Sequence, residues 1–251
     1  MITSEFAFNN SIYEALRIHS SQSDVPLLII LAVIVLLVLA PGFWVRRTMK
    51  RYSQPDDRYA VTGGEAARRL LDAHGLQSVT AEATEAGDHY APDDKAVRLS
   101  KDNFDSRSLT AIVVAAHEVG HAVQDATGYA PLRLRSRLVR WVGPVEKLGA
   151  GLLMATPLIV AITRTPFAGA LMILGGLLTL GVGVVVHLLT LPTEFDASFK
   201  RALPMLATHD VLIHGDERHA KTLLNAAAMT YVAASLMSLL NIARWWAILR
   251  R

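Results

Sequence analysis

Two histidines and a glutamate lie within five consecutive residues, His117-Glu118-Val119-Gly120-His121. Side chains four residues apart share one face of an α-helix, so both imidazoles can direct a nitrogen at the same ion. Glu118 follows the first histidine directly and cannot join as an equivalent ligand, which leaves it to act on water as a general base. The spacing therefore predicts a zinc hydrolase with His117 and His121 as metal ligands and Glu118 as the catalytic residue.

Two histidines leave a catalytic zinc ion one protein ligand short, because such sites hold three protein groups and keep a position for water. The chain contains no cysteine, so imidazole and carboxylate are the ligand groups at hand. Glu194 is the leading candidate because it follows Pro192, at the predicted start of a new helix. Asp196 lies two residues later, on a different helix face, and is a close rival. The remaining options are His187, His209, His214 and His219.

The chain is too apolar for an ordinary soluble domain, since 52% of its 251 residues are hydrophobic and its mean hydropathy is +0.32. The excess lies in four blocks without formal charge that are long enough, or nearly so, to cross a bilayer. These blocks are residues 25–45, 148–163, 167–191 and 223–243. The second block is short and contains Pro157, so it spans only marginally. The sequence predicts a mainly α integral membrane protein with about four transmembrane helices.

Residues 46–132 form the stretch that can fold in water, and we expect a small α+β, zincin-like domain there. Thr62 and Glu65 have the spacing of a capping box, which predicts a helix start, and Gly75 is placed to end that helix. The predicted division of the whole chain is a tail at 1–24, a transmembrane helix at 25–45, the metal domain at 46–132, a basic flank with two transmembrane helices at 133–192, the third-ligand helix and loop at 193–221, and a last transmembrane helix with the C-terminus at 222–251.

The helix that carries the metal motif is predicted to begin at a cap on Asp105 or Ser106. It runs to about Ala126 and stops at Gly128. Nearly every side of this helix is apolar, as the run Ala111-Ile112-Val113-Val114-Ala115-Ala116 illustrates. A helix without a polar face must be buried in protein or pressed against a membrane.

Residues 79–83 and 96–99 have the composition of short β-strands and flank a predicted turn at 91–94. His89 and Tyr90 lie at the entrance of this turn. The hairpin offers an exposed strand edge with which an extended peptide substrate could pair. His89 and Tyr90 are therefore possible substrate-binding groups, and the alternative is a turn that packs on the core.

His187 is the one ionisable group inside its apolar block, and such groups are functional candidates by default. It precedes Glu194 by seven residues, or about two helical turns, and could face the same site. The alternative is a histidine that hydrogen-bonds to a neighbouring transmembrane helix.

Membrane topology restricts the third ligand, because His121 and Glu194 can share an ion only if an even number of crossings separates them. Two crossings are predicted. The net charge of +3 is small, and basic residues cluster beside the apolar blocks at 46–51 and 133–140. Such clusters are typical of cytoplasmic flanks, so anionic lipid explains them better than nucleic acid, and we expect a lipid-facing or solvated arginine series at 133–140. The site is predicted on the cytoplasmic side of a cell membrane, although the C-terminal arginines argue mildly against that orientation.

Several segments together resemble a known family: 88–90, 97–100, 115–124, 128–132, 191–198 and 228–234. Over these segments the chain resembles the bacterial membrane-bound neutral zinc metallopeptidases, the YugP-like proteins, and the likeness extends from about Val25 to Arg251. The resemblance implies a zinc peptidase with one catalytic ion, and it favours Glu194 as the third ligand. Many glutamate-type zinc peptidases carry an aspartate four residues after that glutamate. Here Ser198 occupies the position, which puts a supporting role for an aspartate there in doubt.

The function that follows is hydrolysis of peptide bonds in a peptide or protein substrate. One alternative is an intramembrane, site-2-type zinc protease, but the uncharged window 108–116 is short for a metal helix that must itself span. Another is a non-catalytic membrane scaffold that binds zinc, and a metal transporter would need more polar groups in its transmembrane helices. An oligomer or a regulatory membrane partner is compatible with the sequence.

Overall fold

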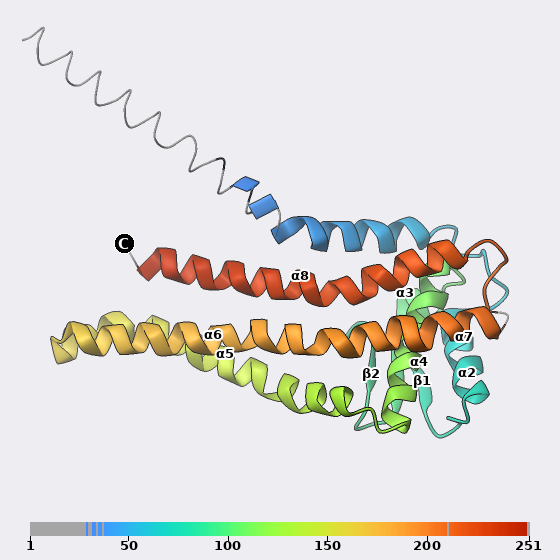
Figure 1. Ribbon diagram of the computed structural model, residues 1–251, viewed down its shortest axis with the longest axis horizontal. Coiled ribbons are helices and arrows are strands. Elements are labelled where there is room, and N and C mark those ends of the chain that lie inside the picture. The colour runs from blue at the N-terminus through green and yellow to red at the C-terminus, as the bar shows by residue number, and fades with distance from the viewer. Residues whose placement is uncertain (1–28, 30–31, 34, 37, 210, 250–251) are drawn as a thin grey trace, which may run out of the picture. The chain divides into compact units, whose positions relative to one another are not determined.

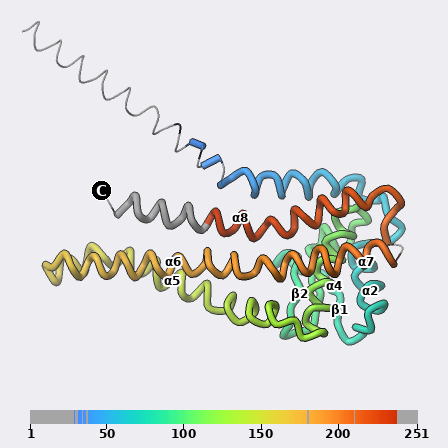
Figure 2. Tube along the Cα trace, viewed as in Figure 1, coloured from blue at the N-terminus to red at the C-terminus, as the bar shows by residue number. Residues whose placement is uncertain are grey.

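A computed structural model describes the chain at residues 29, 32, 33, 35, 36, 38–209 and 211–249 (Figure 1, Figure 2). The chain divides into two compact units, Met1–Ala40 and Pro41–Arg251. All described residues of the smaller unit are helical. The predicted tail at 1–24 and much of the predicted first transmembrane helix lie outside the described residues.

The larger unit is mainly helical and contains a three-stranded sheet, as predicted. Residues 41–52 are helical. The elements that follow are α2 (Gly63–Ala73), β1 (Thr80–Thr84), β2 (His89–Ala91), β3 (Ala96–Ser100), α3 (Lys101–Phe104), α4 (Leu109–Ala126), α5 (Ala130–Thr163), α6 (Pro166–Phe195), the π-helix η1 (Asp196–Ala202), α7 (Leu203–Thr208) and α8 (Glu217–Leu249).

The sheet has the strand order β1-β3-β2, with β3 parallel to β1 and antiparallel to β2. The two strands predicted from composition are present within one residue of their expected bounds. These two strands, β1 and β3, run parallel and so are not the two arms of one hairpin. The arms of the hairpin are β2 and β3. The turn between β2 and β3 includes Lys95 at φ 52°. A hairpin is thus present at the predicted turn, but its first arm is β2 and not the predicted strand at 79–83, and β2 is an edge strand of the sheet.

Local capping explains where α2 begins and ends. Thr62 accepts a hydrogen bond from the Glu65 backbone N–H, and the Glu65 carboxylate accepts one from the Thr62 N–H. This reciprocal pair is the predicted capping box. Gly75 follows the helix with φ +72°, a left-handed conformation that glycine adopts at little cost.

The start of α4 differs from the prediction. Ser108 is the cap and accepts a hydrogen bond from the Ala111 N–H, so the helix begins after both Asp105 and Ser106. The reason is that Asp105 closes the short helix α3, while the Ser106 hydroxyl accepts a hydrogen bond from the Ser108 N–H and shapes the connection. The predicted end at Ala126 is confirmed.

Every residue from Ser108 to Ala122 is buried. Helix α4 packs against α2, β3, η1 and α8, which together leave its apolar surface no exposed side. The prediction that this helix is buried is therefore confirmed, and protein elements account for the burial.

Helices α5 and α6 lie side by side and antiparallel (Figure 1). Small residues permit the approach: a Cβ atom on Gly149 would lie 3.0 Å from the Gly176 carbonyl oxygen. By length and composition the helical stretches Ala130–Thr163 and Pro166–Thr208 are able to cross a membrane. The second, third and fourth apolar blocks of the sequence thus lie within α5, α6 and α8.

The segment that carries Glu194 does not begin a new helix, contrary to the prediction. Helix α6 continues through Pro192 to Phe195, and the chain then winds as η1 before α7. A proline removes one backbone donor, yet α6 continues past it, and the η1 segment that follows packs closely against α4. Glu194 therefore lies at the end of α6.

Candidate metal centre

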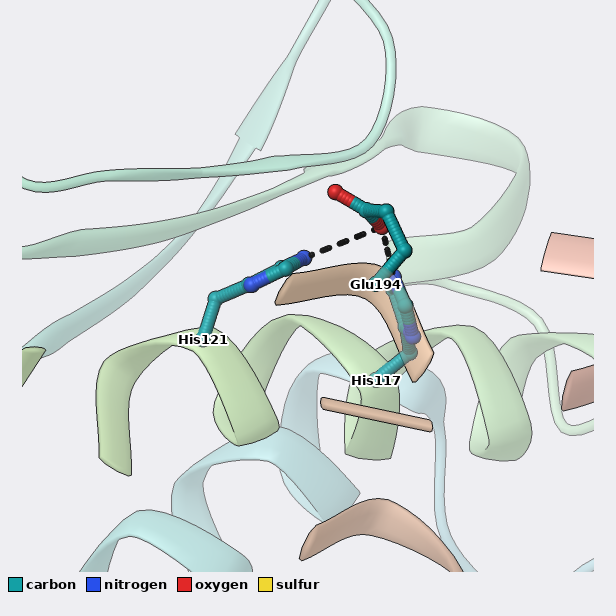
Figure 3. Close-up of side chains that lie close together, drawn as sticks. All are labelled: His117, His121 and Glu194. Atoms are coloured by element: carbon teal, nitrogen blue, oxygen red, sulfur yellow. Dashed lines mark ion pairs between the residues drawn. The ribbon is translucent and has the colours of Figure 1, made fainter. Parts of the chain in front are cut away.

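Helix α4 and the end of α6 bring together the three predicted metal ligands (Figure 3). The Glu194 Oε2 atom lies 3.3 Å from His117 Nε2 and 3.4 Å from His121 Nε2. The candidate ligand atoms all lie within 4.8 Å of one another, and all three side chains are buried. The return of the chain through α5 and α6 thus places a carboxylate opposite two imidazoles one helical turn apart.

The surroundings of the Glu194 carboxylate indicate whether this cluster fits a metal ion. It is fully buried, and neither of its oxygens accepts a hydrogen bond from the described part of the chain. Its nearest cation is Arg135, whose Nη1 lies 3.0 Å from Oε1, and Oε2 faces the two imidazoles. A buried carboxylate without such donors is costly. Two imidazoles and one carboxylate at one point form a ligand set that zinc takes in hydrolases, so the residues fit this ion.

Ser198 orients the His117 ring through a contact with its Nδ1 atom. His117 Nδ1 lies 3.1 Å from the Ser198 hydroxyl oxygen, and that hydroxyl donates to the Leu224 carbonyl at 3.4 Å. Because the serine proton is used by Leu224, His117 Nδ1 is the donor in the first contact, and Nε2 is free to bind a cation. Ser198, four residues after Glu194, thus contacts the candidate ligand His117.

The ring of His121 is held by a longer chain of hydrogen bonds. Its Nδ1 lies 2.9 Å from Gln124 Oε1, and the Gln124 amide donates to the Thr193 carbonyl at 2.9 Å and to Asp196 Oδ2 at 2.8 Å. Asp196, the predicted rival of Glu194, therefore holds a metal-site histidine through Gln124. Sequence reasoning did not single out Gln124, although it lies within the segment that carries the family resemblance.

Glu118 and Glu194 dominate the electrostatics of the centre. Burial favours a lower pKa for His117, but its close contact with Glu194 and the charges of Glu118 and Glu194 outweigh burial and raise the pKa above its usual value. The buried groups thus favour positive charge at this point.

A cavity of about 210 Å³ opens beside the cluster. Glu118 lines it together with the three candidate ligands, and it lies on the same helix between the two histidines. Apolar residues form another part of its wall: Met49, Val113, Val114, Leu223 and Ala227. A carboxylate, a potential metal site and an apolar wall thus face one space.

His89 and Tyr90 of β2 also line this cavity. The Tyr90 hydroxyl donates to Asp125 at 2.7 Å, and burial together with this carboxylate raises the pKa of Tyr90 above its usual value. His89 Nδ1 lies 2.8 Å from the Gly87 carbonyl oxygen. Both residues border the predicted site, and the hydroxyl of Tyr90 anchors the hairpin to the end of α4.

The other histidines lie elsewhere. His187 packs on α8, with its ring centroid 6.3 Å from that of Tyr231, and is not among the described residues that line the cavity. His209 packs against the His74 ring, while His219 contacts Asp216. His214 is fully exposed.

Sequence reasoning also missed Arg135 and Tyr231. The prediction that the arginine series is a lipid-facing or solvated flank is wrong for Arg135, which lies on α5 and donates to the Tyr231 hydroxyl of α8 while it contacts Glu194. Both residues line the cavity. Tyr231 lies within a segment of the family resemblance, whereas the arginine spacing carries no signal that Arg135 alone faces inward.

Comparisons with known proteins agree with the geometry. The family model described as "Putative neutral zinc metallopeptidase" matches residues 27–250. The "Putative membrane protease YugP" of Bacillus subtilis (strain 168) is 36% identical over 220 residues, which cover 82% of this chain and 91% of that protein. No solved structure matches the chain. The chain therefore belongs to the family described as putative neutral zinc metallopeptidases.

Proposed function

We propose that this protein is a membrane-bound zinc metalloendopeptidase in which Glu118 is the general base. The observation that carries the proposal is the buried group of His117, His121 and Glu194, with Glu118 beside it on one cavity. Zinc, when bound by these residues, supplies a Lewis acid and lowers the pKa of water to about 7. Membership of a zinc metallopeptidase family supports the assignment.

The chain's own residues account for the proton transfers. The Glu118 carboxylate accepts a proton from the attacking water and passes it to the nitrogen of the leaving amine. Ser198 and Gln124 fix the two imidazoles, so that the ligand nitrogens do not have to reorient during turnover. The apolar wall of the cavity limits the access of bulk water to the reacting groups.

The proposed substrate is an extended segment of a peptide or protein that pairs with the edge strand β2. This strand lines the cavity through His89 and Tyr90. A second hollow shares Tyr90, His121 and Arg135 with the cavity and continues along Leu132 and Val139 of α5. Main-chain pairing with β2 would place a substrate across both hollows, next to the metal ligands.

The proposed location is a bacterial cell membrane, crossed by four helices, with the site on the cytoplasmic side. Support comes from the two long apolar helices, from their many exposed apolar side chains, and from a relative named as a membrane protease. The basic residues at 46–51 support the orientation. Packing of α4 against α2 and β3 argues against an intramembrane protease, in which the metal helix itself would span.

The direct test is the variant Glu118→Gln, with Glu85→Gln as the control because Glu85 is an exposed glutamate. We expect Glu118→Gln to lose casein cleavage and to keep wild-type zinc content, because it removes the proton acceptor and leaves all three ligands. Cleavage is followed by mass spectrometry, and zinc by elemental analysis of the detergent-purified protein. A full cleavage rate in Glu118→Gln would refute the mechanism and favour a non-catalytic, zinc-binding scaffold.

A further inference from the structure

Arg135, Tyr231 and Glu194 reach the cavity from three different helices, α5, α8 and α6. Arg135 contacts both partners: one guanidinium nitrogen lies 3.0 Å from Glu194 Oε1, and the other donates to the Tyr231 hydroxyl oxygen. The guanidinium carbon also lies 5.2 Å from the centroid of the Tyr231 ring. The arginine thus fixes the carboxylate and the phenol relative to each other.

The direction of the hydrogen bond determines what Tyr231 can do. A guanidinium only donates, so the Tyr231 oxygen is the acceptor, and the phenol's own O–H is not used in this contact. A hydroxyl that accepts a hydrogen bond from a cation becomes a stronger donor itself. Tyr231 lines the same cavity as Glu118, so its hydroxyl borders the space in which a substrate would bind.

Peptide hydrolysis creates a need for such a donor. When water adds to the scissile carbonyl carbon, the carbonyl oxygen gains negative charge, and fixed donors that face this oxygen lower the barrier. Glu118 is the proposed proton acceptor and carries no donor for this purpose when ionised. Tyr231 is a neutral donor, and Arg135 places positive charge directly behind it.

We propose that Tyr231 is a catalytic residue that donates a hydrogen bond to the carbonyl oxygen of the scissile peptide bond, and that Arg135 is a positioning residue for Tyr231 and Glu194. This inference rests on the proposed peptidase function. It assigns to Arg135 and Tyr231 a role beyond joining α5, α6 and α8.

The test compares Tyr231→Phe with Tyr52→Phe, because Tyr52 packs on the His219 ring of a different region. The probe is a fluorogenic peptide selected for cleavage by the wild type. We expect Tyr231→Phe to lower kcat by about 10²–10³-fold, with KM and zinc content within about twofold of wild type. Tyr52→Phe should match the wild type in all three. A wild-type kcat in Tyr231→Phe would overturn the proposal.

A binding measurement separates the catalytic role from a structural one. A phosphinic peptide carries a charged tetrahedral oxygen where the substrate carries its carbonyl, so its affinity should fall in Tyr231→Phe by about the same factor as kcat/KM. Calorimetry gives this affinity without turnover. If zinc content falls with activity, or if the inhibitor binds with unchanged affinity, Tyr231 has a structural role and the proposal is wrong.

Arg135→Lys tests the positioning role. A lysine ammonium lacks the planar fork that contacts two partners at once, so kcat should fall in this variant as well. If Arg135 acts through Tyr231, adding Arg135→Lys to Tyr231→Phe should lower kcat much less than it does in the wild type. If the losses in kcat from the two substitutions are fully additive, Arg135 does not act through Tyr231.

Different results would contradict the peptidase function and the role of Tyr231. The proposed peptidase function is contradicted if the wild type binds no zinc, or if the Glu118→Gln variant cleaves as fast as the wild type. A wild type whose activity requires Glu118 but is unaffected by Tyr231→Phe contradicts only the inference about Tyr231.

Discussion

At the scale of single residues, the centre is defined by which nitrogen of each histidine is already in use. His117 Nδ1 contacts Ser198, and His121 Nδ1 contacts Gln124. Both Nε2 atoms therefore point at Glu194. Fixing the ring tautomer and orientation in this way increases metal affinity, because the side chains lose less conformational entropy when a metal ion binds.

Ser198→Ala tests this orientation. We expect zinc affinity to fall by about 10–100-fold, because His117 loses the acceptor that fixes its ring. Competition with a chromophoric chelator measures the affinity. Ser235→Ala is the matched control, since Ser235 is also buried but bonds within its own helix α8. Equal zinc affinities in the two variants would contradict the assigned role of Ser198.

At the scale of elements, the site depends on the contact between α4 and η1. A Cβ atom on Gly120 would lie 2.8 Å from the Ala197 carbonyl oxygen, so the glycine inside the metal motif permits η1 to pass directly over the helix. This approach lets Asp196 and Ser198 reach the side chains behind the two histidines. A π-helical turn at such a place is typical of functional sites.

Gly120→Ala should therefore destabilise the protein by about 1–3 kcal/mol through overpacking, partly offset by the higher helix propensity of alanine. Thermal unfolding in detergent measures the change, and zinc affinity should fall with it. Gly143→Ala is the control, because a Cβ atom on Gly143 of α5 would meet no atom within 4 Å. A Gly120→Ala protein as stable as the control would show that the contact tolerates a methyl group.

Local patterns were sufficient to predict the elements that local interactions specify. The capping box at Thr62, the turn that precedes β3 and the end of α4 follow from nearby residues, and all three are confirmed. Continuation of α6 through Pro192 and the π-helical winding of η1 were not predicted. The η1 segment packs against α4, which is distant in the sequence, and no pattern in the neighbouring residues records this contact.

At the scale of the whole molecule, the long helices connect distant parts of the chain into one site. Helices α5 and α6 carry the chain away from α4 and back, which brings Glu194 to His117 and His121 (Figure 1). The two membrane crossings predicted between His121 and Glu194 made this meeting predictable. The inward direction of Arg135 was not predictable, because it depends on how α5 and α8 pack beside α6.

The central claim is that Glu194 completes a zinc site with the two motif histidines, and the zinc content of purified Glu194→Ala tests it most directly. Wild type and Asp196→Ala, each saturated with zinc and then freed of excess metal, should hold about one ion per chain, because Asp196 acts only through Gln124. Glu194→Ala should lose stoichiometric zinc. Retention of one zinc ion by Glu194→Ala, or its loss from Asp196→Ala alone, would contradict the account.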